Sequence, residues 1–220
     1  MLRIWLEKID ITNTGFTKPA ATWNEKFDRT EYIFGEAPNE YLASHAAMLL
    51  PGQRALAVAD GEGRNSVWCA QQGLMVDAFD LSPIGIAKAK ALAADRGIAV
   101  NFFISSCEDW DWMPEKYDVV LLIFVQFATP ELRAQLFAHC IETLKPGGLL
   151  ILQGYTPKQL EFKTGGPPIL AHLYTETMLR EALASMDILD CSFYEREIRE
   201  GTHHVGMSAL CGVVARKRTA

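Results

Sequence analysis

Between residues 54 and 153, short apolar runs alternate with amphipathic segments, and this alternation restricts the possible fold more than any other feature of the sequence. We predict strands at the apolar runs, which are residues 54–59, 74–80, 100–104, 117–123 and 149–153. The amphipathic segments between them, residues 64–72, 83–96 and 130–144, predict helices, of which the last two have Ser82 and Thr129 as N-caps and the third has the apolar stripe of a helix that packs on a sheet. Alternating strands and helices form right-handed βαβ units. The sequence therefore predicts an α/β protein with a Rossmann-like, doubly wound, mostly parallel sheet.

The pattern changes after residue 186, where two β-rich runs follow each other without a helix between them. These runs, residues 187–198 and 205–215, predict an antiparallel hairpin. Its turn is expected at residues 199–203, where Gly201 can adopt a positive φ.

The chain has 220 residues, enough for one domain with a full core. We expect a single domain over residues 23–220, preceded by an N-terminal extension at residues 1–22. The formal net charge is −6, and the only basic run is residues 216–218. This balance disfavours a nucleic-acid partner. The sequence leaves open whether the protein is a monomer or a homodimer.

The five cysteines are far apart and never form a C-x-x-C pair, which argues against a disulfide framework and against a zinc site. We therefore expect reduced thiols, a cytoplasmic location and no bound metal. Four charged residues interrupt the first ten, and the longest uncharged apolar run, residues 119–127, is too short to span a bilayer. Neither a signal peptide nor a membrane partner is expected.

A glycine-containing loop, Asp60-Gly61-Glu62-Gly63-Arg64-Asn65, follows the first predicted strand. Glycines at this position let the backbone approach a ligand at a helix N-terminus. The second predicted strand ends at Asp80, which is placed to accept hydrogen bonds from ribose hydroxyls. Together they predict a cofactor that contains adenosine.

The charge of this loop distinguishes between two such cofactors. A dinucleotide site usually has a third glycine where this chain has Ser66, and the acids Asp60 and Glu62 would repel a diphosphate. The same acids suit S-adenosylmethionine, which carries a sulfonium and an ammonium group. A nicotinamide-dependent oxidoreductase is the less favoured alternative, since the chain also lacks a Tyr-x-x-x-Lys pair.

The loop at 60–65, the acid Asp80 and Leu144-Lys145-Pro146-Gly147-Gly148 resemble class I S-adenosylmethionine-dependent methyltransferases, over about residues 23–217. Within that superfamily, Trp23-Asn24-Glu25-Lys26-Phe27, Tyr32-Ile33-Phe34-Gly35 and Pro38-Asn39 are similar to the tellurite-resistance and thiopurine methyltransferase-like group. The resemblance implies a seven-stranded sheet whose last strand is antiparallel.

The resemblance, together with the positions of the strand ends, assigns a set of residues to S-adenosylmethionine and its product S-adenosylhomocysteine. Asp80 is expected at the ribose, the loop at 60–65 at the methionine moiety, and Cys107 and Glu108 near adenine. The family's usual acid in the first strand is Ala57 here, so either Asp60 replaces it or the methionine end is held differently. The full expected set is Trp23, Tyr32, Gly35, Asp60, Gly61, Gly63, Asn65, Asp80, Leu81, Cys107, Glu108 and Phe124.

The fourth predicted strand shows which methyl acceptors are disfavoured. It is not followed by an Asn/Asp-Pro-Pro-Tyr/Phe motif or an acid pair, and the chain has no Pro-Cys pair, which disfavours amino-group, metal-dependent catechol and cytosine C5 methylation. The resemblance implies a small-molecule substrate such as a thiol or chalcogen oxyanion. Gln126, Tyr155 and His203 are candidate substrate contacts. Glu200-Gly201 with His204 and Gly206 resembles a pattern of the same group, so His204 is the candidate catalytic residue. A non-catalytic sensor of the cofactor or its product is the alternative.

Overall fold

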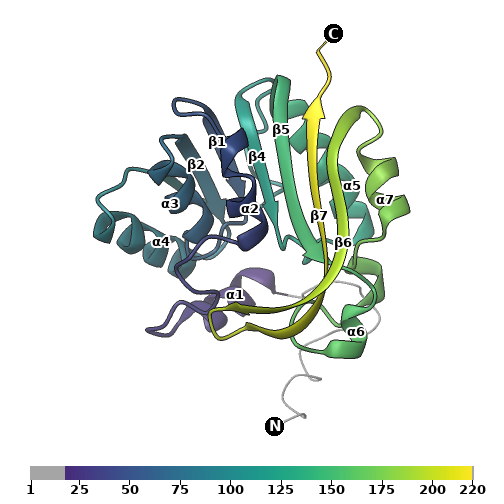
Figure 1. Ribbon diagram of the computed structural model, residues 1–220. Coiled ribbons are helices and arrows are strands. Elements are labelled where there is room, and N and C mark those ends of the chain that lie inside the picture. The colour runs from purple at the N-terminus through teal and green to yellow at the C-terminus, as the bar shows by residue number, and fades with distance from the viewer. Residues whose placement is uncertain (1–17, 220) are drawn as a thin grey trace.

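The structure is a computed structural model that describes residues 18–219, and its centre is a seven-stranded sheet in the order β3-β2-β1-β4-β5-β7-β6 (Figure 1). The first five strands are parallel, and β7 is antiparallel to both of its neighbours. The strands are β1 (Arg54–Val58), β2 (Met75–Asp80), β3 (Asn101–Ile104), β4 (Tyr117–Ile123), β5 (Leu144–Tyr155), β6 (Met186–Glu200) and β7 (His204–Lys217). The predicted fold class, with its antiparallel terminal hairpin, is confirmed.

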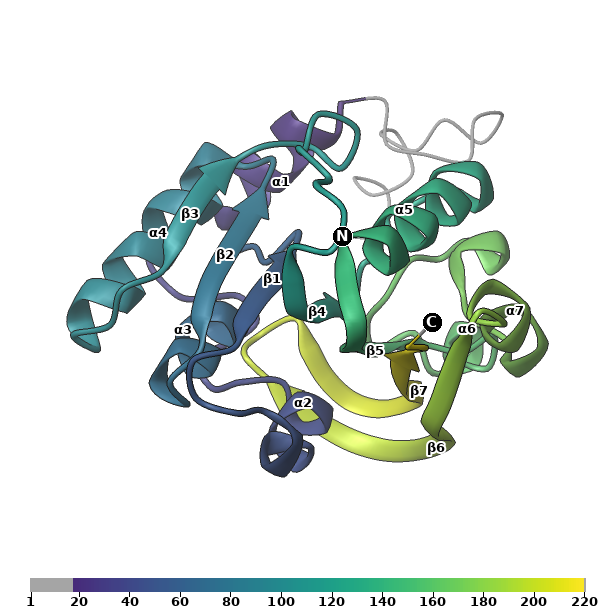
Figure 2. The ribbon, with the colours of Figure 1, turned by 90° about the horizontal axis from the view of Figure 1, so that it is seen from above.

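Helices cover both faces of this sheet, as Figure 2 shows. One face packs on α5 (Pro130–Thr143) and α7 (Glu176–Ala182), and the other packs on α2 (Glu40–Ser44) and α3 (Arg64–Gln71). Alternate residues of each strand serve the two cores, so Leu56 and Val58 face the α5 side while Ala55 and Ala57 face the α3 side. The remaining helical segments are α1 (Pro19–Phe27), η1 (Ala46–Met48), α4 (Pro83–Asp95), α6 (Gln159–Phe162) and η2 (Leu170–His172).

Two helices begin at the caps that the sequence predicts. The Ser82 side chain accepts a hydrogen bond from the backbone N–H of Gly85 at the start of α4, and Thr129 accepts one from Leu132 at the start of α5. Each satisfies a backbone donor that the helix itself leaves unpaired.

Residues 145–148, part of the glycine-containing motif before the fifth predicted strand, lie within β5 as an irregularity. Tyr117 of β4 pairs with Leu144, but the next pair joins Val119 to Leu149, so the intervening residues leave the ladder. Gly147 permits this with a φ of 79°. Strand β5 therefore begins earlier than its apolar run suggests.

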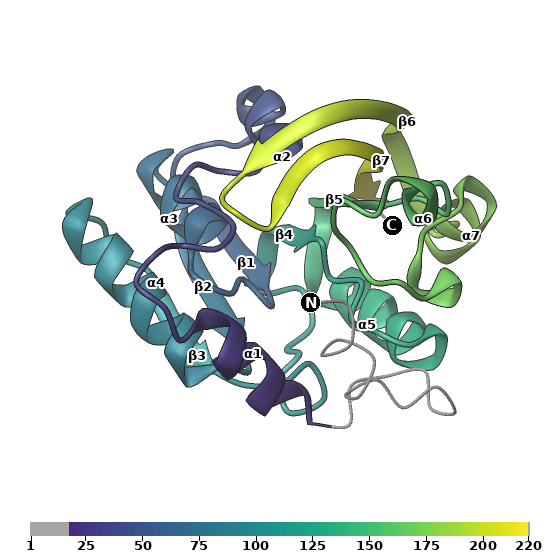
Figure 3. The same cartoon turned by 90° about the horizontal axis from the view of Figure 1, so that it is seen from below.

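Strands β6 and β7 form a long hairpin whose turn bends beneath the carboxyl ends of the central strands, toward α1 (Figures 1 and 3). The backbone N–H groups of Thr202 and His203 donate to the Ile33 carbonyl at 2.9 and 3.0 Å. The hairpin thus contacts the segment between α1 and α2 and closes one side of the sheet edge at which ligands bind in open α/β sheets.

Helix α1 crosses the predicted boundary between residues 22 and 23. Residues 1–17 of the predicted extension lie outside the described residues, and the division into extension and domain stays a prediction. Among the helices of residues 18–219, none has both the length and the apolar character needed to cross a membrane.

Candidate functional site

The glycine loop connects β1 to α3, and every second residue from 59 to 63 has a positive φ: Ala59 at 48°, Gly61 at 61° and Gly63 at 90°. A Cβ at Gly63 would lie 2.6 Å from the Cβ of Ala89, so only glycine lets α3 begin this close to α4. The carboxylate of Asp80 holds the loop, because it accepts hydrogen bonds from Gly61 N at 2.9 Å and Ser82 N at 2.8 Å. Asp80, at the end of β2, therefore anchors the loop that contains Asp60, the other acid of the predicted cofactor site.

Asp60 carries a buried acceptor atom without a partner. The residue is partly exposed as a whole, yet its Oδ2 is enclosed and has no hydrogen bond. Burial raises the pKa of Asp60 to about 7; a hydrogen bond with Ser66 opposes the rise, and the charge of Asp80 adds to it. Burial likewise raises the pKa of Asp80 to about 6, against its backbone hydrogen bonds. This pair fits a ligand that brings donors or a positive charge.

Glu62 does not share in that negative site, contrary to the charge argument made from the sequence. Its Oε1 lies 2.5 Å from the Nζ of Lys88, and its Oε2 accepts a hydrogen bond from Ile33 N at 2.8 Å. Glu62 is thus neutralised and holds the segment before α2. The sequence does not reveal this contact because Lys88 lies on α4, 26 positions after Glu62.

The segment from α1 to residue 35 lies over the glycine loop. Phe27 is buried, and a Cβ at Gly61 would lie 3.2 Å from its ring. Trp23 stacks on Phe27 with ring centroids 5.4 Å apart. Tyr32 instead lies against α4, where its hydroxyl donates to the Lys88 carbonyl at 3.0 Å. Of the predicted cofactor residues on this segment, Trp23 thus packs on the ring that contacts Gly61, Tyr32 packs on α4, and Gly35 packs on the hairpin turn at Gly201.

In the loop after β3, the two residues predicted near adenine differ in burial. Cys107 is buried, burial raises the pKa of its thiol to about 12, and its carbonyl accepts a hydrogen bond from Trp112 Nε1 at 2.8 Å. Glu108 is exposed, while Leu81, which directly follows Asp80, is half-buried. Cys107 thus lies near Asp80, whose charge also raises the pKa of its thiol, and Glu108 faces solvent.

Aromatic rings gather at the carboxyl ends of β4 and β5. Phe124 has a φ of 55°, a conformation that costs energy in any residue with a side chain. Its ring centroid lies 4.8 Å from Tyr155 and 4.6 Å from His204, and Phe34 lies 4.5 Å from His204. The Tyr155 hydroxyl is enclosed and has no hydrogen-bond partner. These residues come from distant parts of the chain and together form the aromatic cluster: Phe34, Phe124, Tyr155 and His204.

His204 is the buried member of the predicted histidine pair. Its Nδ1 lies 3.4 Å from Oε2 of Glu200. Burial lowers the pKa of His204; the hydrogen bond to Glu200 opposes this and the charge of Arg64 adds to it. His204 is therefore neutral at neutral pH and suited to accept a proton. His203 is half-buried, with its ring 6.2 Å from Phe34.

The side-chain amide of Gln126, a predicted substrate contact, makes three hydrogen bonds to the backbone. Its Nε2 donates to the carbonyls of Tyr155 at 2.8 Å and His172 at 3.1 Å, and its Oε1 accepts from Tyr155 N at 2.6 Å. The interpretation of Gln126 as a substrate contact is thus corrected, because the side chain is buried and both of its N–H donors fasten the loop after β5.

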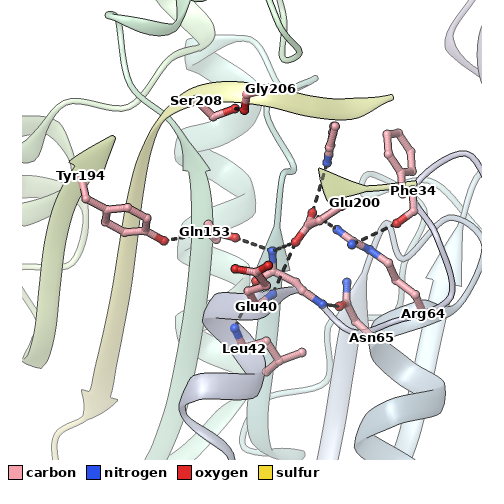
Figure 4. A network of polar contacts seen from close by, with 12 residues as sticks. Phe34, Glu40, Leu42, Arg64, Asn65, Gln153, Tyr194, Glu200, Gly206 and Ser208 are labelled. Atoms are coloured by element: carbon pink, nitrogen blue, oxygen red, sulfur yellow. Dashed lines mark hydrogen bonds and ion pairs between the residues drawn. The ribbon is translucent and has the colours of Figure 1, made fainter. Parts of the chain in front are cut away.

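A buried polar network beneath the hairpin is the feature that the sequence analysis missed (Figure 4). Arg64 Nη2 lies 2.8 Å from Oε2 of Glu200, and its Nη1 donates to the Phe34 carbonyl. Asn65, a predicted cofactor residue, accepts a hydrogen bond from Asn39 N at 2.9 Å and so belongs to this network. The only sequence signal for it was the position of Glu200 four residues before His204.

Within the part of the chain that the structure describes, no group of three or more His, Cys, Asp or Glu side chains could hold a metal ion.

Part of the chain is similar to known proteins. Residues 55–148 match a family described as a methyltransferase domain. A ubiquinone biosynthesis O-methyltransferase of Xanthomonas campestris pv. campestris is 31% identical over 137 residues, which are 61% of this chain and 56% of that protein. The chain thus spans about half the length of this curated relative.

Solved structures share the fold at low sequence identity. Magnesium protoporphyrin IX methyltransferase from Synechocystis, solved with bound S-adenosylhomocysteine, superposes with a TM-score of 0.70 at 21% identity, over 91% of this chain and 98% of that one. TehB from Haemophilus influenzae gives 0.67 at 16% identity, over 90% of this chain and 67% of that one. Such likeness shows the fold, and it is spread over many methyltransferases rather than one subgroup. Residues 55–148 therefore match a methyltransferase domain, and the sheet that contains them has the fold that the solved methyltransferases share.

Proposed function

We propose that this protein transfers the methyl group of S-adenosylmethionine to a small, weakly acidic nucleophile, a thiol or a hydroxyl, that docks against the aromatic cluster. The observation that carries the proposal is the pair of acids at the ends of β1 and β2, with Asp60 Oδ2 enclosed and unpartnered. An acceptor atom in that state is stabilised by a cationic donor, and the ammonium group of the cofactor is one.

The described residues fit the cofactor in three places. Asp60 would accept from its ammonium group, and Asp80 has lone pairs for ribose hydroxyls beyond the two backbone donors it already serves. The backbone at Cys107 would border the adenine. When bound, the cofactor supplies an electrophilic methyl group on a sulfonium.

The acceptor side is apolar apart from His204 and the Tyr155 hydroxyl. Rings of Phe34, Phe124 and Tyr155 surround the imidazole, so a small acceptor with an apolar body would be desolvated there. His204 takes the proton of the acceptor's S–H or O–H group. With the cofactor bound, the acceptor's sulfur or oxygen would receive the methyl group as the methyl–sulfonium bond breaks, and the electron pair of that bond would remain with S-adenosylhomocysteine as the leaving group.

Two further observations support this acceptor class. The motifs shared with the tellurite-resistance and thiopurine methyltransferase-like group favour sulfur or chalcogen nucleophiles, and the curated relative is an O-methyltransferase. A chalcogen oxyanion, being already ionised, would need no proton acceptor.

Calorimetric titration of the purified protein with S-adenosylmethionine, S-adenosylhomocysteine and NADH tests the proposal first. Micromolar binding of the first two without NADH binding is expected, and NADH binding alone would overturn it. A panel of thiols, phenols, selenite and tellurite then tests transfer. His204→Ala should lower turnover of a thiol or phenol by about a hundredfold while leaving cofactor affinity within about threefold. Wild-type turnover in that variant would remove His204 from the mechanism.

The second candidate function is a sensor that binds the cofactor without transferring its methyl group. It is supported by Ala57, which stands in β1 where the resembled family usually has an acid. Tight cofactor binding with no methylated product from any acceptor in the panel would favour it.

A further inference from the structure

We propose that Glu200 is a positioning residue that sets the tautomer and orientation of the His204 ring and joins it to the start of α3. This inference rests on the proposed function, because it assigns to Glu200 the preparation of His204 as a proton acceptor.

Glu200 lies at the end of β6 with its side chain buried. Its Oε2 lies 2.8 Å from Arg64 Nη2 and 3.4 Å from His204 Nδ1. Its Oε1 accepts a hydrogen bond from Asn39 Nδ2 at 3.0 Å and one from Glu40 N at 3.4 Å. Burial opposes its ionisation, but His204 and Arg64 outweigh this and lower the pKa of Glu200 to about 2. Both oxygens are therefore engaged, and the group is a carboxylate at neutral pH.

An ionised carboxylate only accepts hydrogen bonds, so it determines which nitrogen of His204 carries the proton. With Nδ1 facing Glu200, the favoured neutral tautomer has its hydrogen on Nδ1. The other nitrogen, Nε2, then carries the lone pair that a proton acceptor needs. Without Glu200 the ring would be free to place its hydrogen on either nitrogen.

Arg64 extends this arrangement to the cofactor loop. It is the first residue of α3 and directly follows Gly63, and it also donates to the Phe34 carbonyl. The ion pair with Glu200 thus spans from the loop that precedes α3 to the hairpin that carries His204. A buried pair of this kind fixes geometry, because breaking it leaves an uncompensated charge.

The groups around His204 determine how its ionisation responds when Glu200 is changed. The charges near it are Glu200 from β6, Arg64 from α3 and His203 from the hairpin turn, while β5 contributes the neutral Tyr155. The rings of Phe34 and Phe124 carry no charge. Glu200 alone favours the protonated imidazole, so its neutralisation should lower the pKa of His204 further.

Nitrogen NMR of the histidine-labelled protein tests this without any substrate. In E200Q the His204 titration should move to lower pH by about one unit or more, and the preference for hydrogen on Nδ1 should weaken. E197Q is the matched control, because Glu197 lies on the same strand, is exposed and pairs only with neighbouring Arg199 among the described ion pairs. If E200Q does not fold, E200D keeps the charge, shortens its reach and should weaken the Nδ1 preference. An unchanged tautomer and titration in whichever of the two variants folds would overturn the proposal.

Kinetics with a thiol or phenol acceptor separates positioning from a general structural role. E200Q should lower kcat by about tenfold or more, with the KM for S-adenosylmethionine within about threefold of wild type. In the His204→Ala background the same substitution should cause no further loss. A full additional loss there would show that Glu200 acts through the fold and would overturn the proposal. If no acceptor is methylated at all, the proposed function fails, and the NMR result still decides the role of Glu200.

Discussion

Replacing Asp60 with asparagine tests the electrostatics of the cofactor loop most directly. Burial raises the pKa of Asp60 from its ordinary value of 3.8 to about 7, which means that the folded protein favours the protonated acid. Asparagine has nearly the same shape and never ionises. The variant therefore removes the cost of a buried charge while keeping the packing.

The expected size of the effect follows from the pKa difference. A shift of about three pKa units corresponds to about 4 kcal/mol, which is an upper limit because part of the residue contacts solvent. Between the unfolded and folded pKa values the folded state binds more protons than the unfolded state, so wild-type stability falls as pH rises. Below about pH 4 the acid is protonated in both states and this contribution to stability is fully present. It is lost as pH rises toward about 7 and stays lost above it.

Urea unfolding of both proteins, followed by tryptophan fluorescence from about pH 4 to about pH 8, measures this dependence. The difference in unfolding free energy between Asp60→Asn and wild type should increase in favour of the variant as pH rises, by up to about 4 kcal/mol. Asp80 is present in both proteins, so most of its own titration cancels in the difference. A difference that stays constant across the pH range would refute the reasoning. The same variant should bind S-adenosylmethionine about tenfold more weakly at neutral pH, since it lacks the charge for the ammonium group.

Two other substitutions test separate parts of the site. Asp80→Ala should weaken S-adenosylmethionine binding in calorimetry by about tenfold or more while the circular dichroism spectrum remains that of the folded protein, and unchanged affinity would show that the ribose lies elsewhere. Gly201→Ala should lower the free energy of unfolding by about 1–3 kcal/mol more than Gly97→Ala does. The two glycines share a φ near 63°, but only at Gly201 would the Cβ meet a neighbour, the Ile33 carbonyl at 2.3 Å. Equal losses in urea unfolding would mean that the hairpin turn moves aside without cost.

The parts of the fold that local physics determines were predictable from the sequence. Strand β4 coincides with its apolar run, and α4 and α5 begin at the predicted caps, Ser82 and Thr129, because each cap rests on a hydrogen bond within three residues. Placing Asp60 and Asp80 at neighbouring strand ends needed only the parallel sheet. These predictions depended on spacing, which a single sequence displays.

The contacts that the sequence did not reveal join residues far apart in the chain. Nothing near Glu62 indicates that Lys88 will neutralise it, and nothing near Gln126 indicates that the backbone of Tyr155 will engage its amide. Whether a polar side chain faces a ligand or another part of the protein depends on such long-range partners. The sequence could nominate the carboxyl-end loops as the candidate site, but it could not show the partners of individual residues.

The hairpin of β6 and β7 also has a consequence for the order of folding. The glycine loop and Asp80 are complete once the first parallel strands pair, whereas the Arg64–Glu200 and Asn39–Glu200 contacts close separations of 136 and 161 residues. Contacts of such separation form slowly, since the loop entropy is lost before they stabilise the structure. A nascent or refolding chain should therefore form the loops proposed to bind the cofactor first and the proposed acceptor site last. An intermediate that binds the cofactor before it can methylate anything is the expected kinetic signature.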